Sequence, residues 1–210
     1  MASIYNRLFA KLYDKFMHGF EKGLVSNRNE LVSGLKGKVL EVGSGTGVNF
    51  SFYNKDAEVT ALEPSAPMIK VSKTKNCNCS KIDYVNNGIT DDILFNYVDE
   101  KSFDNIISTL VLCTVDNPKK AIANYKRLLK PNGKLIVLEH IHSTSKKDRI
   151  LQNIANPFWN VFSEGCNLNR NTDQLIIEGG FKSVKHEYFV KTLRWVKGVY
   201  ELDSKTGSSL

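Results

Sequence analysis

Three glycines at alternate positions follow a short apolar segment, and this spacing is the strongest chemical signal in the chain. Residues 39–42 are predicted to form a strand that runs directly into Gly43, Gly45 and Gly47. Because glycine has no Cβ, a turn built from it lets the backbone approach a ligand closely. The dinucleotide-binding fingerprint needs its third glycine at the sixth position, which is Val48 here. The spacing therefore favours a ligand other than a dinucleotide, with a plain strand-to-helix turn as the alternative.

An acidic residue lies one predicted strand further along the chain. Residues 58–62 form that strand, and Glu63 follows it. Its carboxylate can accept two hydrogen bonds from ribose hydroxyls, and a hydrogen bond to a charged group contributes about 1.5–3 kcal/mol. The register of Glu63 after the glycines favours ligand binding over a solvated loop acid. The other candidate binding residues lie at or beside strand ends, namely Glu41, Ser44, Pro64, Gly88, Ile89, Thr109 and Leu110.

Two histidines follow the predicted strand at residues 134–139. His140 is the better placed to act as a general base, and His142 is the second candidate. A base assists catalysis if the reacting group is a hydroxyl, a thiol or an ammonium. The alternative for His140 is a polar residue that closes a pocket.

The four cysteines give no pattern of their own. They are too few and too scattered along the chain for a disulfide framework, and none has the spacing of a zinc knuckle (Cys77, Cys79, Cys113 and Cys166). We expect no metal site, and we expect Cys113 to be a buried structural thiol.

Short apolar strands alternate with helix-compatible segments from residue 38 onward. The predicted strands are residues 39–42, 58–62, 82–85, 103–108 and 134–139, followed by a pair at 181–191 and 193–202. This alternation predicts an α/β fold, with a doubly wound, mostly parallel sheet of seven strands and an antiparallel terminal strand.

A length of 210 residues favours one domain. We divide it into a helical cap (1–34), a ligand-binding core (35–141), a substrate-covering insert (142–178) and a terminal strand pair (179–203). In the cap, apolar residues recur at a spacing of four, at Ile4, Leu8, Leu12, Phe16 and Phe20. That face is expected either to close the substrate pocket or to touch a membrane surface.

The ordered motifs resemble those of a known enzyme family. Glu41-x-Gly43-x-Gly45-x-Gly47, Glu63 and the segments 103–107 and 128–134 look like the class I S-adenosylmethionine-dependent methyltransferases of the ubiquinone/menaquinone-methylase type. That likeness covers residues 37–141. Segments 110–115, 138–140 and 156–170 resemble the membrane-associated thiol S-methyltransferases, although residues 1–34 lack the hydrophobic anchor of that group.

The resemblance implies a methyl donor, S-adenosylmethionine, with S-adenosylhomocysteine as its product. It also implies a small hydrophobic acceptor that is methylated at O, S or N, such as a quinone or phenol, a thiol or a lipid headgroup. We predict an acceptor wall built from the cap and the insert, consisting of Tyr5, Tyr13, Phe16, Trp159, Phe162 and Arg170. Arg170 has a structural ion pair as its alternative.

The composition limits the kinds of partner that we expect this protein to bind. The net charge is +7, but the lysines are spread along the chain without interleaved aromatic residues, so we expect no nucleic-acid partner. No apolar run approaches the ~20 residues of a membrane span, and the expected location is the cytoplasm with a peripheral membrane contact as an option. A nucleotide-dependent oxidoreductase of similar topology and a non-catalytic binding module remain alternative functions.

Overall fold

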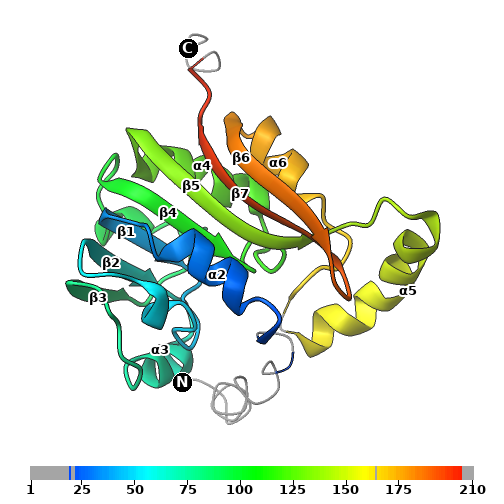
Figure 1. The fold of residues 1–210 in the computed structure, drawn as a ribbon, viewed down its shortest axis with the longest axis horizontal. Helices are drawn as coiled ribbons and strands as arrows, with labels where there is room; N and C mark the ends of the chain where they lie inside the picture. The colour runs from blue at the N-terminus through cyan, green and yellow to red at the C-terminus, as the bar shows by residue number, and fades with distance from the viewer. Residues whose placement is uncertain (1–18, 20–21, 164, 205–210) are drawn as a thin grey trace.

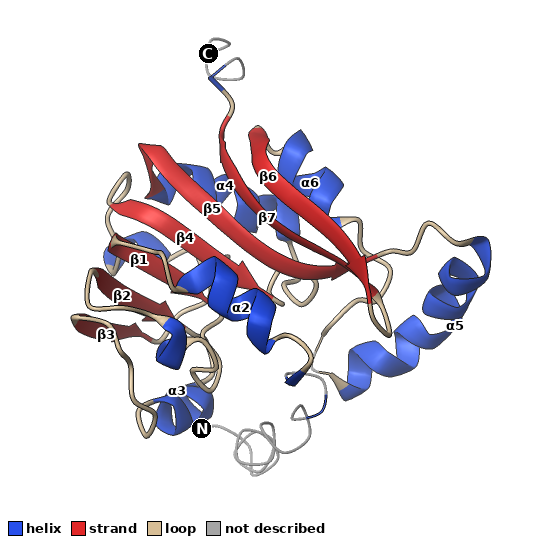
Figure 2. Cartoon of the chain, in the orientation of Figure 1, coloured by secondary structure: helices blue, strands red, loops and turns tan. Residues whose placement is uncertain are grey.

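One twisted sheet of seven strands crosses the molecule in the order β3-β2-β1-β4-β5-β7-β6 (Figures 1 and 2). The computed structural model describes residues 19, 22–163 and 165–204. The strands are Gly37–Val42 (β1), Ala57–Leu62 (β2), Lys81–Val85 (β3), Phe103–Thr109 (β4), Leu129–Ile141 (β5), Phe181–Val190 (β6) and Arg194–Leu202 (β7). Neighbouring strands from β3 to β5 are parallel, whereas β7 is antiparallel to both β5 and β6. The predicted fold class is confirmed.

The strand order reverses between β1 and β4, and this reversal places the site. From β1 the chain builds β2 and β3 outward on one side, and then β4 and β5 on the other. In open sheets of this kind, ligands bind outside the carboxyl ends of the strands at the reversal point. The segments that follow Val42 and Thr109 are therefore the ones expected to meet a ligand.

Helices cover both faces of the sheet. They are Val25–Val32 (α2), Ala66–Ser72 (α3), Pro118–Leu128 (α4), Lys146–Phe162 (α5) and Thr172–Glu178 (α6), with short 3-10 turns at Phe50–Phe52 (η1) and Leu94–Asn96 (η2). Figure 2 shows α2 on one face and α4 with α6 on the other. On β1 the two faces alternate, since Val39 packs in the cluster that contains Val32 of α2, and Leu40 packs in the cluster that contains Ile122 of α4. Both faces are apolar because both are covered.

The last two helices differ in how they pack. Ile176 of α6 is fully buried in the same cluster as α4, so α6 belongs to the layer that covers the sheet. Helix α5 lies apart from the sheet at the right of Figure 1. Within the proposed insert at residues 142–178, α5 and the loop after it are therefore the part available to cover an acceptor.

Candidate functional site

The three glycines of the loop after β1 all have positive φ angles, a conformation that residues with a side chain rarely adopt. The φ angles of Gly43, Gly45 and Gly47 are +62°, +54° and +79°. A Cβ on Gly43 would lie 2.7 Å from Cγ2 of Val111, and one on Gly47 would lie 2.7 Å from the Phe50 ring. A Cβ on Gly45 would meet only the Gly43 carbonyl oxygen, at 3.9 Å. Two of the glycines are thus required by internal packing, whereas Gly45 borders open space.

Glu63 ties the end of β2 to this loop. Its side chain is buried, and its Oε2 accepts a hydrogen bond from the Gly45 backbone N–H at 3.0 Å. The other oxygen, Oε1, accepts from the Ser65 N–H at 2.9 Å. The acid that was predicted to accompany the glycines in sequence therefore lies against them in space.

A cavity of about 70 Å³ separates the glycine loop from α2 and the end of β4. It is lined by Arg28, Glu41, Gly43, Ser44, Gly45, Thr46, Val48, Asn49, Thr109 and Leu110. Six of the predicted binding residues lie in this lining, while Gly47, Glu63, Pro64, Gly88 and Ile89 lie outside it. The Ser44 hydroxyl is buried and has no hydrogen-bond partner among the described residues. Leu110 has a φ of +60°, a conformation that is uncommon for a residue with a side chain and that often occurs at functional sites.

A buried polar network forms the floor of the cavity. Arg28 Nη1 donates to Asn49 Oδ1 at 2.8 Å and to Thr109 Oγ1 at 3.0 Å. Asn49 Nδ2 donates to Glu41 Oε1 at 3.1 Å, and the Tyr53 hydroxyl donates to Glu41 Oε2 at 2.8 Å. The sequence pattern missed Arg28, Asn49 and Tyr53, because single polar residues on a helix or a turn look like solvated ones.

Burial raises the pKa of Glu41 to about 7, against the opposing hydrogen bonds from Tyr53 and Asn49 and the charge of Arg28. A carboxyl whose folded pKa exceeds its unfolded value stabilises the fold fully below the unfolded pKa and loses that contribution as the pH rises through the folded pKa. Between about pH 4.5 and 7, stability should therefore fall by roughly 3 kcal/mol on account of this group.

The variant Glu41→Gln should lose this dependence, because an amide does not ionise. We expect urea denaturation to show the parent losing stability relative to Glu41→Gln between pH 5 and pH 8. Glu58→Gln, on the exposed face of β2, is the matched control and should follow the parent. A constant difference between the parent and Glu41→Gln over this pH range would contradict the prediction.

The predicted residues after β3, together with Pro64, lie outside the lining of this cavity. Ile89 is buried in the core, where its carbonyl accepts a hydrogen bond from Asn124 Nδ2 at 2.7 Å, and the Gly88 N–H donates to Asp91 Oδ2 at 2.6 Å. Pro64 is exposed, with its carbonyl bound by Asn86 Nδ2 at 2.9 Å. Asn87, which precedes Gly88 in the chain, is buried, and its Oδ1 has no hydrogen-bond partner among the described residues. Asn87 is thus a further polar candidate that the sequence did not single out.

His140 lies in a cluster with two cysteines. Its side chain is 2% exposed, and its Nε2 lies 3.0 Å from Cys166 Sγ. A hydrogen bond also joins Cys166 Sγ to Cys113 Sγ at 3.7 Å. The contact with Cys113 and the nearby His140 lower the pKa of Cys166, while the contact with Cys166 and burial raise the pKa of Cys113. The sequence hides this cluster, because His140 and Cys166 are 26 positions apart and Cys113 and Cys166 are 53 apart. The other two cysteines, Cys77 and Cys79, form a disulfide.

The predicted acceptor wall is described only in part. Tyr5, Tyr13 and Phe16 lie outside the described residues. Trp159 packs near Phe162, with ring centroids 6.2 Å apart, and its indole is close enough to Cys166 to lower the pKa of that thiol.

Arg170 holds the loop after β4. Its Nη1 donates to the Leu112 carbonyl at 2.6 Å and to the Val115 carbonyl at 2.7 Å. These two bonds to backbone carbonyls give Arg170 a structural role, and its part in binding the acceptor stays a prediction.

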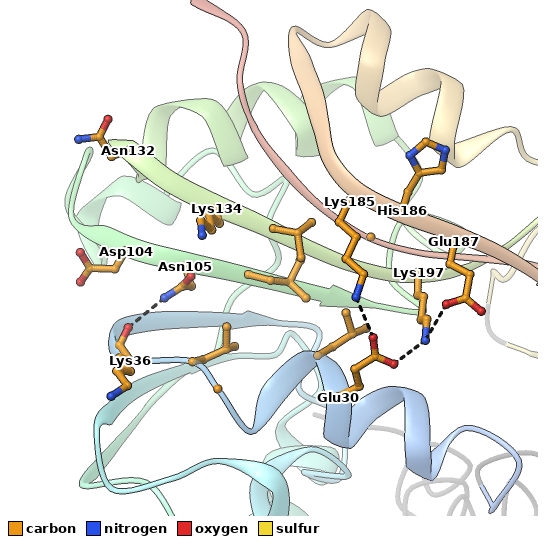
Figure 3. Close-up of a pocket in the computed structure, with 16 residues that line it drawn as sticks. Glu30, Lys36, Asp104, Asn105, Asn132, Lys134, Lys185, His186, Glu187 and Lys197 are labelled. Atoms are coloured by element: carbon orange, nitrogen blue, oxygen red, sulfur yellow. Dashed lines mark hydrogen bonds and ion pairs between the residues drawn. The ribbon is translucent and has the colours of Figure 1, made fainter.

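A separate cavity of about 440 Å³ lies on the sheet face beside α2 (Figure 3). Figure 3 shows its charged side chains turned toward one another, with Glu30 between Lys185 and Lys197. The Glu30 carboxylate lies 3.4 Å from the first ammonium and 2.5 Å from the second. The opposite side is lined by Asp104 and Asn105, at the amino end of β4 and so remote from the glycine loop. These walls satisfy their own charges, and we assign the cavity no part in the site.

Comparisons with known proteins agree with this geometry. A family described as "Methyltransferase domain" matches residues 40–137. The thiol S-methyltransferase TMT1B of Mus musculus is 30% identical over 192 residues, which is 90% of this chain and 78% of the mouse protein. The chain belongs to the S-adenosylmethionine-dependent methyltransferases. Their methyl donor is therefore the donor of this enzyme, and the oxidoreductase and non-catalytic alternatives fall away.

Two further comparisons, one of sequence and one of structure, agree with this family. A demethylmenaquinone methyltransferase of Renibacterium salmoninarum is 36% identical over 108 residues, 51% of this chain and 43% of that protein. The crystal structure of an S-adenosylmethionine-dependent methyltransferase of Thermotoga maritima superposes with a TM-score of 0.60 at 18% identity, covering 90% of this chain and 96% of that one, and supports the fold. None of the helices within the described ranges combines the length and apolar character that crossing a bilayer needs.

The residues present fit the donor. Among the described residues, no side chain lies within 4 Å of a Cβ placed on Gly45, and the buried Ser44 hydroxyl has no hydrogen-bond partner. S-adenosylmethionine carries a positive sulfonium and an amino acid group with one ammonium and one carboxylate. The cavity lining offers the Glu41 carboxylate, the Arg28 guanidinium and hydroxyls such as that of Ser44 as partners for these groups.

Proposed function

We propose that this methyltransferase transfers a methyl group from S-adenosylmethionine to the thiol of a small hydrophobic molecule. The observation that carries the acceptor is the 30% identity with a thiol S-methyltransferase across 90% of the chain. This identity favours sulfur among the O, S and N acceptors that the sequence leaves open. Trp159, which lies beside the Cys166 thiol and packs near Phe162, supports an apolar acceptor.

In this proposal the donor lies along the carboxyl ends of β1, β2 and β4. Its methionine part occupies the cavity beside Gly43, Ser44 and Gly45, with the carbonyls of Thr109 and Leu110 facing its amino group. Glu63 binds the ribose hydroxyls, and the segment after β3 at Gly88 and Ile89 borders the adenine. The cap, core, insert and strand-pair division of residues 1–34, 35–141, 142–178 and 179–203 is retained, with α5 over the acceptor.

Little chemical assistance is required from side chains. Methyl transfer from a sulfonium is an in-line displacement, so the donor is already activated and alignment of acceptor, methyl and sulfur supplies up to roughly 7–11 kcal/mol. The acceptor thiol must lose its proton, because the thiolate is the nucleophile. His140 is the proposed group for this proton, and its Nε2 lies 3.0 Å from Cys166 Sγ.

A screen of methyl acceptors tests the proposal. The purified full chain is incubated with S-adenosylmethionine and one member each of a matched set, an alkyl thiol, the alcohol of the same carbon skeleton and the corresponding amine. Formation of S-adenosylhomocysteine with the thiol alone is the expected result. Turnover of the alcohol or amine in preference to the thiol would overturn the choice of acceptor.

A peripheral membrane contact is a second proposal, and the polarity of α5 favours it. The side of α5 that faces its own loop is polar: Gln152 Nε2 donates to the Leu168 carbonyl at 3.0 Å, and Asn156 Oδ1 accepts from the Leu168 N–H at 2.7 Å. The opposite side is apolar and at least half exposed (Ile150, Leu151, Ile154, Phe158, Val161 and Phe162). Lysines and an arginine begin the same helix and suit anionic lipid headgroups (Lys146, Lys147 and Arg149).

The double variant Ile154→Asp/Phe158→Asp should therefore bind vesicles of phosphatidylcholine and phosphatidylserine at least about 10-fold more weakly than the parent. Each apolar side chain that enters the bilayer contributes about 1.5–3 kcal/mol to binding. Sedimentation with the vesicles measures the change. Ile93→Asp replaces an equally apolar side chain, 52% exposed, away from α5 and should bind like the parent. Equal loss in both variants would remove the assignment to α5.

A further inference from the structure

The Cys113–His140–Cys166 cluster has the ligand set of a metal centre. The Cys113 Sγ, Cys166 Sγ and a ring nitrogen of His140 all lie within 4.8 Å of one another. We propose that these three residues bind one Zn²⁺ ion and leave its fourth position to the acceptor thiol. The use of the fourth position by the acceptor thiol rests on the proposed function, whereas the zinc site itself does not.

The distances suit a tetrahedral zinc ion. Two sulfurs that are each about 2.3 Å from zinc at a tetrahedral angle are about 3.8 Å apart, and a sulfur and an imidazole nitrogen are about 3.5 Å apart. The two Sγ atoms are 3.7 Å apart here, and His140 Nε2 is 3.0 Å from Cys166 Sγ. The sulfur pair fits as it stands, the contact between His140 and Cys166 is about half an ångström shorter than zinc ligation requires, and the third pair, Cys113 and His140, lies within 4.8 Å. Two cysteines and one histidine with an open position form one of the known ligand sets of catalytic zinc.

Hydrogen bonds of the surrounding loops hold the ligands in place. The Cys113 N–H donates to Glu139 Oε2 at 3.3 Å, and the Cys113 carbonyl accepts from the Asn167 N–H at 2.8 Å, one residue after Cys166. The His140 ring packs edge-on against Trp195, with ring centroids 5.8 Å apart. The three side chains are thus brought together by the protein itself, as a preorganised site requires.

The partly exposed member of the cluster lies beside one residue of the proposed acceptor wall. Cys113 and His140 are buried, while Cys166 is partly exposed and lies beside Trp159. A zinc ion deprotonates a thiol that coordinates it. With zinc bound, His140 would be a ligand and not the base, so the acceptor thiol would give its proton to solvent. Its sulfur would form the bond to the methyl carbon, and the carbon–sulfur bond of the sulfonium would break. The thioether and neutral S-adenosylhomocysteine are the products, and the zinc is unchanged.

Metal binding can be measured without any acceptor. The reduced full chain is treated with a chelator, desalted and titrated with Zn²⁺ against a chromophoric chelator, and its bound metal is counted by atomic absorption. Co²⁺ then replaces Zn²⁺ to report thiolate ligands by their charge-transfer absorption. We expect one ion per chain and a thiolate–cobalt band.

Three variants locate the site. Cys166→Ser and His140→Gln each remove one ligand. Each should weaken zinc binding by more than the 10–100-fold that is lost when a residue hydrogen-bonded to a metal ligand is removed. Cys166→Ser should also weaken the cobalt band. The double variant Cys77→Ser/Cys79→Ser removes two cysteines outside the cluster and should bind like the parent. Circular dichroism shows that each variant is folded.

The outcomes separate the two halves of the inference. Zinc that binds the parent and the Cys166→Ser variant equally, or no zinc retained by the reduced parent, overturns the site. If zinc binds at the cluster and the metal-stripped protein methylates the thiol at the same rate, the fourth position is not used by the acceptor. Zinc binding at the cluster with no thiol turnover would leave the site standing and remove the proposed thiol acceptor.

Discussion

Gly45→Val is expected to weaken S-adenosylmethionine binding at least about 100-fold, or about 2.7 kcal/mol. At the φ of +54° a β-branched residue is strained, and its side chain would enter the space that borders the glycine loop. Relief of the strain would move the Gly45 N–H away from Glu63 Oε2, 3.0 Å distant in the parent. Calorimetric titration with S-adenosylmethionine measures the loss, and thermal unfolding shows that the chain still folds.

Gly34→Val is the matched control for this substitution. Gly34 is exposed, its φ lies outside the left-handed region, and a Cβ there would meet nothing within 4 Å. The control should bind the donor as the parent does. Parent-like binding by folded Gly45→Val would show that the donor does not lie against this loop.

Glu139→Ala is expected to cost at least about 3 kcal/mol of unfolding free energy, because it leaves three buried N–H groups without their acceptor at about 1–3 kcal/mol each. Glu139 is fully buried in β5. Its Oε1 accepts from the N–H groups of Val111 and Leu112, both at 2.8 Å, and its Oε2 accepts from that of Cys113 at 3.3 Å. Such a loss is a large part of the 5–15 kcal/mol that stabilises a typical domain.

Glu139→Gln distinguishes the lost acceptor from the lost charge. The amide keeps an oxygen for the two shorter bonds and loses only the bond from Cys113, so we expect a cost of about 1 kcal/mol. Glu58→Ala, on the exposed side of β2, should change stability little. Urea denaturation of the four proteins measures these differences. An equal cost for the alanine and glutamine variants would show that the charge, and not the hydrogen bonds, stabilises the loop after β4.

Residues whose role depends on local spacing could be predicted from the sequence. Gly43, Gly45 and Glu63 follow short strands rich in apolar residues, and alternate glycines after a strand fix both a turn and its position at the edge of the sheet. The strand pair at the end of the chain was equally visible, since its side chains alternate. These signals are local, so they also supplied the fold class, whereas the donor came from the resemblance to a known family.

Residues whose role depends on contacts between distant segments could not be predicted. Arg28 reaches Thr109 across 81 positions, and Cys113 meets Cys166 across 53. A cysteine or an arginine looks the same in sequence whether it faces solvent or a partner from another strand. The structure buries Ile89 in the core, and the contact with the adenine that its position after β3 suggests stays a prediction.

By itself, the sequence determined the strands and the glycine loop, because each depends on residues a few positions apart whose backbone preferences are fixed locally. The methyl donor followed from the resemblance of these motifs to a known family. Only the tertiary structure decided which polar groups meet at the carboxyl ends of β4 and β5. The pairing of β4 with β5 and the packing of the loop between α5 and α6 bring His140, Cys113 and Cys166 together there, and this long-range packing, which no local pattern encodes, sets their distances.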